Sequence, residues 1–133
     1  MSTVYVETDV LFAVAKPDAW LAEEVEAVLA EEAVETSLLA YAEFLVATYE
    51  EGNGFAFEVA PTVANMLELV PIGSERDEAV LLAAATYLDD YDCTPVDALH
   101  AATASTRHGG VLLGTDRVSD GIQDVKRRPL REA

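Results

Sequence analysis

Residues 3–8, TVYVET, decide the fold prediction, and they lie close to the start of a 133-residue chain. A short run of β-branched and aromatic residues is typical of a buried strand. Acidic residues begin where this run ends, at Glu7 and Asp9. We therefore expect a buried strand followed by a turn that carries carboxylates.

Strand-like segments alternate with helix-like segments along the rest of the sequence. Further strands are expected at residues 33–36, 67–72 and 111–113. Alternating strands and helices predict βαβ units, in which the strands run parallel and helices cover both faces of the sheet. We expect one α/β domain over residues 1–133, with a mostly parallel central sheet flanked by helices. Functional residues in such sheets gather at the carboxyl ends of the strands.

Capping and breaking residues mark the expected helices. Helices are expected in five segments: after Asp18, over 38–50 with Ser37 as N-cap, within 55–67, from Ser74 through Leu88, and from Thr94 to about Arg107. Pro61 either opens the third of these helices or kinks it, and the pattern leaves both alternatives open.

The composition bounds the class of protein. Half of the residues are apolar, enough for a core without disulfides, and the single cysteine, Cys93, fits a reducing interior. The longest run without a charged residue, 79–88, is too short to span a membrane, and no basic leader precedes the first strand. We expect a soluble, cytoplasmic protein.

The charge is large and unevenly distributed. The net charge is −17, from 25 acidic and eight basic residues. Residues 1–106 contain 21 of the acids and two bases, whereas residues 107–133 contain four acids and six bases. Repulsion among this many acidic residues would weaken the fold in dilute buffer, so we expect a protein from a cytoplasm at high salt. Near 1 M salt the Debye length shrinks to about 3 Å, which screens such repulsion.

Glu43 stands out because it is the one charged residue in the apolar segment 38–47. A helix there buries most of its circumference, and a buried carboxylate without a partner is costly. Three explanations are open: Glu43 lies at a helix edge, pairs with one of the few bases, or binds a cation.

Other acids are ambiguous when taken singly. Asp97 fits a capping box with Thr94, and Asp116 and Asp120 lie in a segment typical of turns. Together with Glu7 and Glu43, they form a set of carboxylates whose convergence would require divalent cations. Hard oxygen ligands select Mg²⁺ or Mn²⁺, which commonly act on phosphate oxygens. The sequence contains no P-loop, dinucleotide fingerprint, nucleophile elbow or zinc-protease motif to suggest rival chemistry.

Four segments, in this order, resemble the motifs of PIN-domain ribonucleases, in particular VapC-type toxins of toxin–antitoxin pairs. They are VYVETDVLFAVA (4–15), TSLLAYAEFLVA (36–47), TPVDALHAATA (94–104) and VLLGTDRVSDGI (111–122). The resemblance implies a three-layer fold, an Mg²⁺ or Mn²⁺ site, hydrolysis of RNA, a homodimer and a cognate antitoxin. It also implies that Glu43, Asp97 and Asp116 are ligands, with Asp120 competing for the place of Asp116.

One departure from the family pattern concerns the first motif. The family usually has aspartate where this chain has Glu7, and often asparagine where it has Asp9. Glutamate still ligates metal but reaches one methylene further, so either the metal shifts or Asp9 takes over as ligand.

The function predicted from the sequence is that of a metal-dependent endoribonuclease, and two alternative functions stay open. Its catalytic carboxylates are Glu7, Glu43, Asp97 and Asp116. The alternatives are a catalytically degraded module that binds a protein partner and a phosphohydrolase acting on small nucleotides. Basic residues near the C-terminus are expected either to contact RNA phosphates or to pair with the acidic remainder: Arg107, Arg117, Lys126, Arg127, Arg128 and Arg131.

Overall fold

A computed structural model describes residues 3–15, 22–73, 77–107, 110–114 and 120–128. In chain order its elements are β1 (Val4–Val6), α1 (Thr8–Ala15), α2 (Ala22–Glu31), β2 (Val34–Glu35), α3 (Leu38–Gly52), α4 (Val59–Leu69), α5 (Asp77–Asp90), α6 (Pro95–Arg107), β3 (Val111–Leu113) and β4 (Lys126–Arg128). The expected α/β fold is confirmed. No helix in these ranges has the length and apolar character needed to span a membrane.

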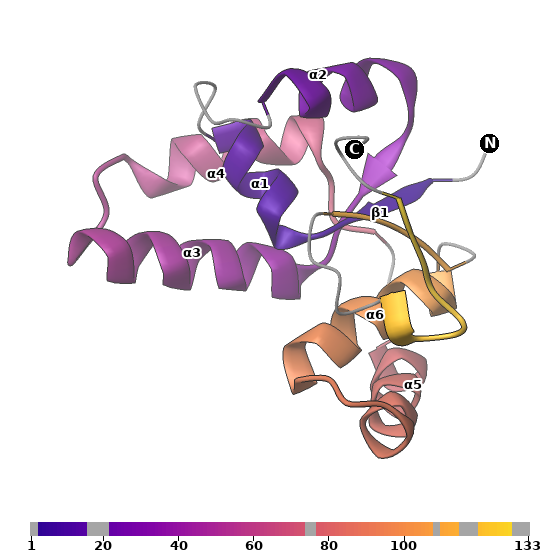
Figure 1. Cartoon of the computed structure of the whole chain (residues 1–133). Coiled ribbons are helices and arrows are strands. Elements are labelled where there is room, and N and C mark those ends of the chain that lie inside the picture. Colours follow the sequence, from indigo (N-terminus) through magenta and orange to yellow (C-terminus); the bar gives the residue numbers. More distant parts are fainter. Residues whose placement is uncertain (1–2, 16–21, 74–76, 108–109, 115–119, 129–133) are drawn as a thin grey trace.

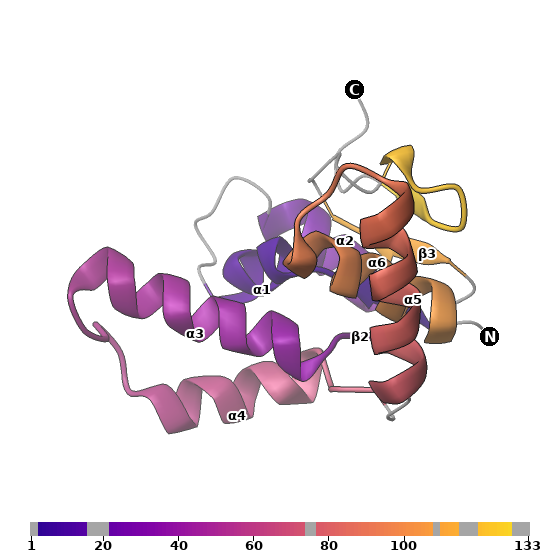
Figure 2. The same cartoon turned by 90° about the horizontal axis from the view of Figure 1, so that it is seen from below.

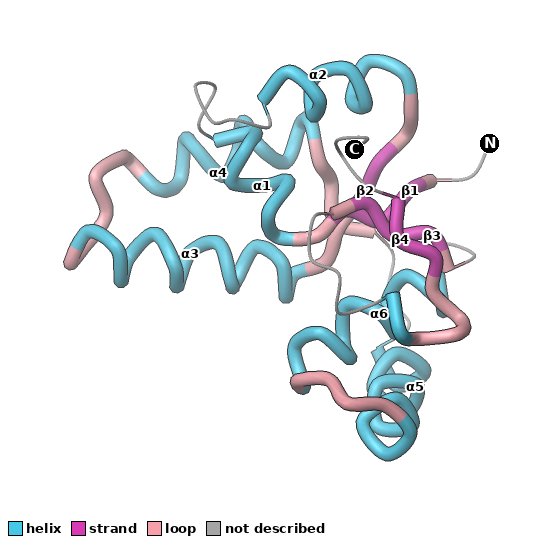
Figure 3. Tube along the Cα trace, in the orientation of Figure 1, coloured by secondary structure: helices cyan, strands magenta, loops and turns pink. Residues whose placement is uncertain are grey.

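The four strands form one sheet in the order β2-β1-β3-β4 (Figure 3). Every pairing is parallel, with Val4 opposite Val34, Val6 opposite Leu113, and Leu113 opposite Arg128. Because all strands run in the same direction, their carboxyl ends lie along one edge, which we call the carboxyl edge. β1 and β3 are the central strands, so the residues that follow them meet in the middle of this edge.

Side chains alternate across the sheet and build two cores. Val4 and Val6 of β1 pack with α1 to α4 on one face, whereas Tyr5 packs with α5 and α6 on the other. Figure 1 shows α5 and α6 together below the strands, and Figure 2 shows them side by side from below. The result is the three-layer arrangement that the sequence predicts.

Local signals explain why α3 lies where it does. The Ser37 side chain accepts a hydrogen bond from the Ala40 N–H at 3.2 Å and caps the first turn, as predicted. At the other end, Asn53 adopts the left-handed conformation with φ 53° and ends the helix. Pro61 lies in the first turn of α4, so it opens that helix and does not kink it.

Two expectations about secondary structure are wrong. Helix α1 begins at Thr8, where a turn was expected, because Val10, Leu11 and Ala13 bury one face of this segment in the core. The first half of the expected strand at 67–72 is the end of α4, and only an isolated bridge between Thr36 and Ile72 remains of the strand. At α1, burial of an apolar face outweighs the local turn signal, and at 67–69 the chain continues the helix α4, whose residue Met66 is buried in the core. The proposed cap residues Asp18 and Ser74 lie outside the described residues.

The edge strand β4 was not predicted. Its residues Lys126, Arg127 and Arg128 pair with β3, although they are charged. Charged residues are common on edge strands because they discourage pairing with another chain. Arg128 is also bound to Glu32, which connects β4 to the residue just after α2.

Candidate functional site

Glu7 lies at the centre of the carboxyl edge, directly after β1. Its backbone N–H donates to the Leu113 carbonyl oxygen at 3.1 Å, which ties it to the end of β3. Glu7 is 8% exposed, and its side chain lies against the backbone of Gly114. The buried strand β1, at the centre of the segment TVYVET, therefore places the carboxylate of Glu7 at the junction of the two central strands.

Glu43 approaches the same edge from α3. Its Oε1 accepts a hydrogen bond from Thr8 Oγ1 at 2.7 Å and another from His100 Nε2. Thr8 directly follows Glu7, and His100 belongs to α6, so three helices meet at this carboxylate. The side chain is 33% exposed, which leaves it accessible from solvent. Three explanations for Glu43 were open from the sequence. The structure shows Glu43 at a partly exposed position, where it accepts hydrogen bonds from the hydroxyl of Thr8 and the imidazole of His100.

A buried network of hydrogen bonds connects His100, which contacts Glu43, to Tyr5 and Ser37. The Tyr5 hydroxyl lies 2.6 Å from His100 Nδ1 and 2.7 Å from Ser37 Oγ. When Nε2–H donates to Glu43 and Nδ1 carries no proton, Nδ1 accepts from the Tyr5 hydroxyl, and Tyr5 in turn accepts from Ser37. The network joins the middle of β1, the cap of α3 and the middle of α6 to one carboxylate.

The electrostatics of Glu43 favour the ionised form. Partial burial by itself raises the pKa of this carboxyl. The hydrogen bonds from His100 and Thr8, together with the charge that His100 carries when protonated, outweigh burial and lower the pKa below its usual value. A carboxylate that stays ionised at neutral pH has the charge that a cation ligand requires.

Asp97 lies on α6, one turn before His100. Its Oδ2 accepts a hydrogen bond from Thr94 Oγ1 at 2.7 Å, and its N–H donates to the same Thr94 oxygen at 3.3 Å. This is the capping arrangement expected from the sequence. The carboxylate is partly exposed and retains one oxygen outside that hydrogen bond, so capping and ligation are compatible.

The remaining candidate acids differ in position. Asp9 lies in the first turn of α1 and is partly buried. Asp120 accepts two hydrogen bonds from Arg127, at 2.9 and 3.3 Å. Asp116 lies outside the described residues.

The donor chemistry of Glu7 and Glu43 at this edge, and of Asp97 on α6, fits a hard divalent cation, because all three offer carboxylate oxygens. The described side chains alone do not form a group of three or more His, Cys, Asp or Glu residues positioned as metal ligands. Asp116, the expected fourth ligand, lies outside the described residues.

The described basic residues of the C-terminal segment are mostly engaged. Arg127 donates to Asp120 and, at 3.1 Å, to the Gly114 carbonyl oxygen, while Arg128 is bound to Glu32. Lys126 is exposed. Pairing with the acidic remainder, one of the two alternatives from the sequence, is therefore observed for Arg128, whereas Arg127 pairs with Asp120 of the same C-terminal segment.

Sequence reasoning missed the partners of Glu43. His100, Tyr5 and Thr8 were not among the site residues predicted from the sequence. A signal existed, because Tyr5 is the polar-tipped residue in the middle of a buried strand and needs a partner for its hydroxyl.

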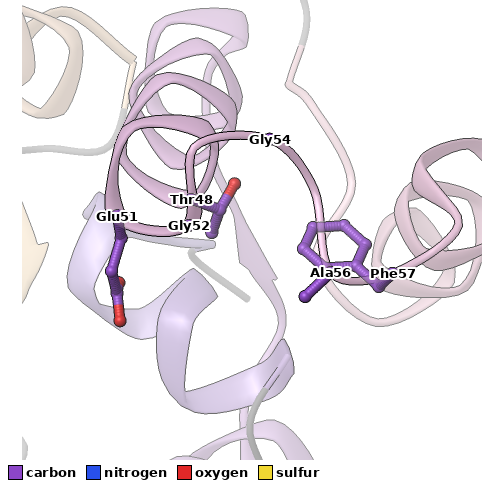
Figure 4. A pocket seen from close by; sticks show the side chains of 6 residues that line it. All are labelled: Thr48, Glu51, Gly52, Gly54, Ala56 and Phe57. Carbon is purple, nitrogen blue, oxygen red and sulfur yellow. The ribbon is translucent and has the colours of Figure 1, made fainter.

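A separate hollow of about 190 Å³ lies where α3 connects to α4 (Figure 4). It contains none of the candidate ligands, so it is distinct from the acidic edge. Its lining residues are Thr48, Glu51, Gly52, Gly54, Ala56 and Phe57.

An all-parallel sheet with carboxylates at its carboxyl edge defines an α/β protein with an acidic site. The chain belongs to the PIN-domain family, whose model matches residues 4–121.

Solved structures support this fold. A toxin–antitoxin complex from Klebsiella pneumoniae is similar with a TM-score of 0.68 and 16% identity, over 93% of this chain and 96% of that one. VapBC2 from Rickettsia felis, bound to a DNA fragment from its promoter, is similar with a TM-score of 0.67 and 11% identity, over 96% of this chain and 98% of that one. At these identities the likeness concerns the fold. No curated protein sequence matches the chain significantly.

Proposed function

We propose that this protein is a metal-dependent endoribonuclease, the toxin of a VapBC-like pair, which hydrolyses RNA phosphodiester bonds at the carboxyl edge. The observation that carries the proposal is Glu43, an ionised carboxylate held by Thr8 and His100 beside the end of the central strand. Membership of the PIN-domain family supports it, as do two similar structures that are toxin–antitoxin complexes.

The proposed ligands of Mg²⁺ or Mn²⁺ are Glu7, Glu43, Asp97 and a fourth carboxylate. Asp116 is favoured for the fourth place because Asp120 is already occupied by Arg127. When bound, such a cation polarises the phosphate and lowers the pKa of a coordinated water.

The chain's own residues contribute orientation. Thr8 and His100 fix the direction of the Glu43 carboxylate, and the hydrogen bond between Thr94 and Asp97 fixes the second acid. Carboxylates that are already oriented do not have to be ordered when the substrate binds. This orientation favours a high reaction rate, because a misplacement of about 1 Å can lower the rate a hundredfold.

Protein partners are part of the proposal. Several large apolar side chains of α3, α4 and α5 are exposed: Leu38, Val46, Tyr49, Leu69, Leu81 and Leu82. Burying a side chain of this kind contributes about 1.5–3 kcal/mol. We propose that a cognate antitoxin and a second copy of the chain cover these faces.

The alternative function is a protein-interaction module that has kept the fold and lost the reaction. It is favoured by the lack of a three-ligand group among the described residues and by the same exposed apolar side chains. Metal binding discriminates between the two functions.

The proposal predicts RNA cleavage by the purified protein that requires Mn²⁺ or Mg²⁺ and stops with a chelator. Glu43→Gln and Asp97→Asn should each lower the cleavage rate about a hundredfold or more, because a neutral amide is a poor ligand for a hard cation.

Glu50→Gln is the matched control, because Glu50 is an exposed acid on the same helix. It should leave the rate unchanged. Cleavage that persists in Glu43→Gln, or that needs no metal, would exclude this site, and the alternative module predicts no cleavage by any of the proteins.

A further inference from the structure

Gly114 lies directly against the Glu7 side chain at the carboxyl edge. A Cβ built at Gly114 would overlap Glu7 Oε2, and it would lie 2.9 Å from Glu7 Cδ and 3.2 Å from Cγ. Each of these separations is shorter than ordinary van der Waals contact. The carboxylate of Glu7 therefore occupies the space that any side chain at position 114 would need.

The backbone of Gly114 cannot easily move away from Glu7. Its N–H donates to the Arg128 carbonyl oxygen at 3.3 Å, and its own carbonyl oxygen accepts from Arg127 Nη1 at 3.1 Å. On the other side, the Glu7 N–H is bonded to the Leu113 carbonyl oxygen at 3.1 Å. Gly114 is thus held between β1 and β4, the neighbours of β3 in the sheet.

The backbone conformation does not explain the glycine. The described glycines with positive φ are Gly54 and Gly110, and Gly114 is not among them. An alanine at position 114 would meet no penalty from φ, so the obstacle to a side chain there is the Glu7 carboxylate.

We infer that Gly114 is a positioning residue for Glu7: the missing side chain creates the slot in which the longer acid lies, and the two residues function as a pair. The inference rests on the proposed function in so far as it makes Glu7 a cation ligand. It explains how a glutamate fits at the carboxyl edge, because the extra methylene is accommodated across β3. In the sequence, Gly114 directly precedes Thr115 and Asp116, the proposed fourth ligand.

A double-mutant cycle tests the pair. The proteins are the native chain, Gly114→Ala, Glu7→Asp and the double variant, each measured for thermal unfolding without metal and for Mn²⁺ affinity by calorimetry. Gly114→Ala alone should lower the melting temperature by about 5 °C and weaken Mn²⁺ binding about tenfold. With Glu7→Asp present, the shorter acid withdraws from the slot, and adding Gly114→Ala should change both quantities much less.

Two controls separate the slot from general effects. Gly121→Ala places a methyl group where nothing lies within 4 Å, and it should leave both quantities unchanged. Glu7→Gln keeps the length of the side chain, so Gly114→Ala should remain as destabilising with it as with Glu7. If Gly114→Ala prevents folding, recovery of a folded protein on adding Glu7→Asp is the expected result.

Equal effects of Gly114→Ala with and without Glu7→Asp would overturn the inference, as would no effect in either. The unfolding cycle needs no metal, so its result is independent of the proposed function. If the native chain binds no Mn²⁺ while the unfolding cycle shows coupling, the slot is supported and the nuclease proposal is excluded.

Discussion

Tyr5 shows how a buried polar group can serve the fold and the site together. Its ring is fully buried in the core beneath α6, and its hydroxyl lies within hydrogen-bond distance of His100 and Ser37. Removing one member of such a network leaves buried partners unsatisfied, at a cost of about 1–3 kcal/mol. The network therefore links the stability of the core to the orientation of Glu43.

Tyr5→Phe should lower the free energy of unfolding by about 1–3 kcal/mol, measured by urea denaturation. The ring stays in place, so the loss comes from His100 Nδ1 and Ser37 Oγ, which lose the hydroxyl between them. Tyr49→Phe is the control, because Tyr49 is exposed and its ring contact with Phe55 survives the change. Equal small losses in both variants would show that the Tyr5 hydroxyl contributes no net stability.

Elements whose ends carry local signals were predictable from the sequence. Ser37 and Asn53 bound α3, and Thr94 with Pro95 begins α6, each through a hydrogen bond or backbone angle that involves near neighbours in the chain. The first strand was also predictable. Its residues are buried on both faces of a parallel sheet, and such strands appear in the sequence as short, nearly continuous apolar runs.

Elements that depend on distant contacts were not predictable. Helix α1 forms where a turn was expected because its apolar face packs on α3 and α4. The strand β4 consists of three basic residues, and its pairing with β3 and the contact of Arg128 with Glu32 involve residues far apart in sequence. Local propensity carries no information about such partners.

The same distinction between local signals and distant contacts applies to the residues of the candidate site. Glu43 and Asp97 could be selected from the sequence, because one is isolated in an apolar helix and the other follows a helix-start signal. The partners of Glu43, above all His100, 57 residues away, could be assigned only with the fold in hand. The slot at Gly114 is likewise a property of adjacent strands.

At the scale of the whole molecule, the net charge of −17 should make stability depend on salt. Screening weakens repulsion among exposed carboxylates, whereas the buried cores of the two sheet faces are little affected by it. We predict that the melting temperature rises from dilute buffer to molar KCl, measured by circular dichroism. A melting temperature that falls on adding KCl would contradict the expectation of a protein adapted to high salt.

The central claim is that the carboxyl edge binds a divalent cation through Glu43. Calorimetric titration of Mn²⁺ into the native chain, Glu43→Gln and Glu50→Gln tests it most directly. The account predicts saturable binding by the native chain, an affinity at least about tenfold weaker in Glu43→Gln, and no change in Glu50→Gln. No binding by the native chain, or the same affinity in Glu43→Gln as in the native chain, would contradict it.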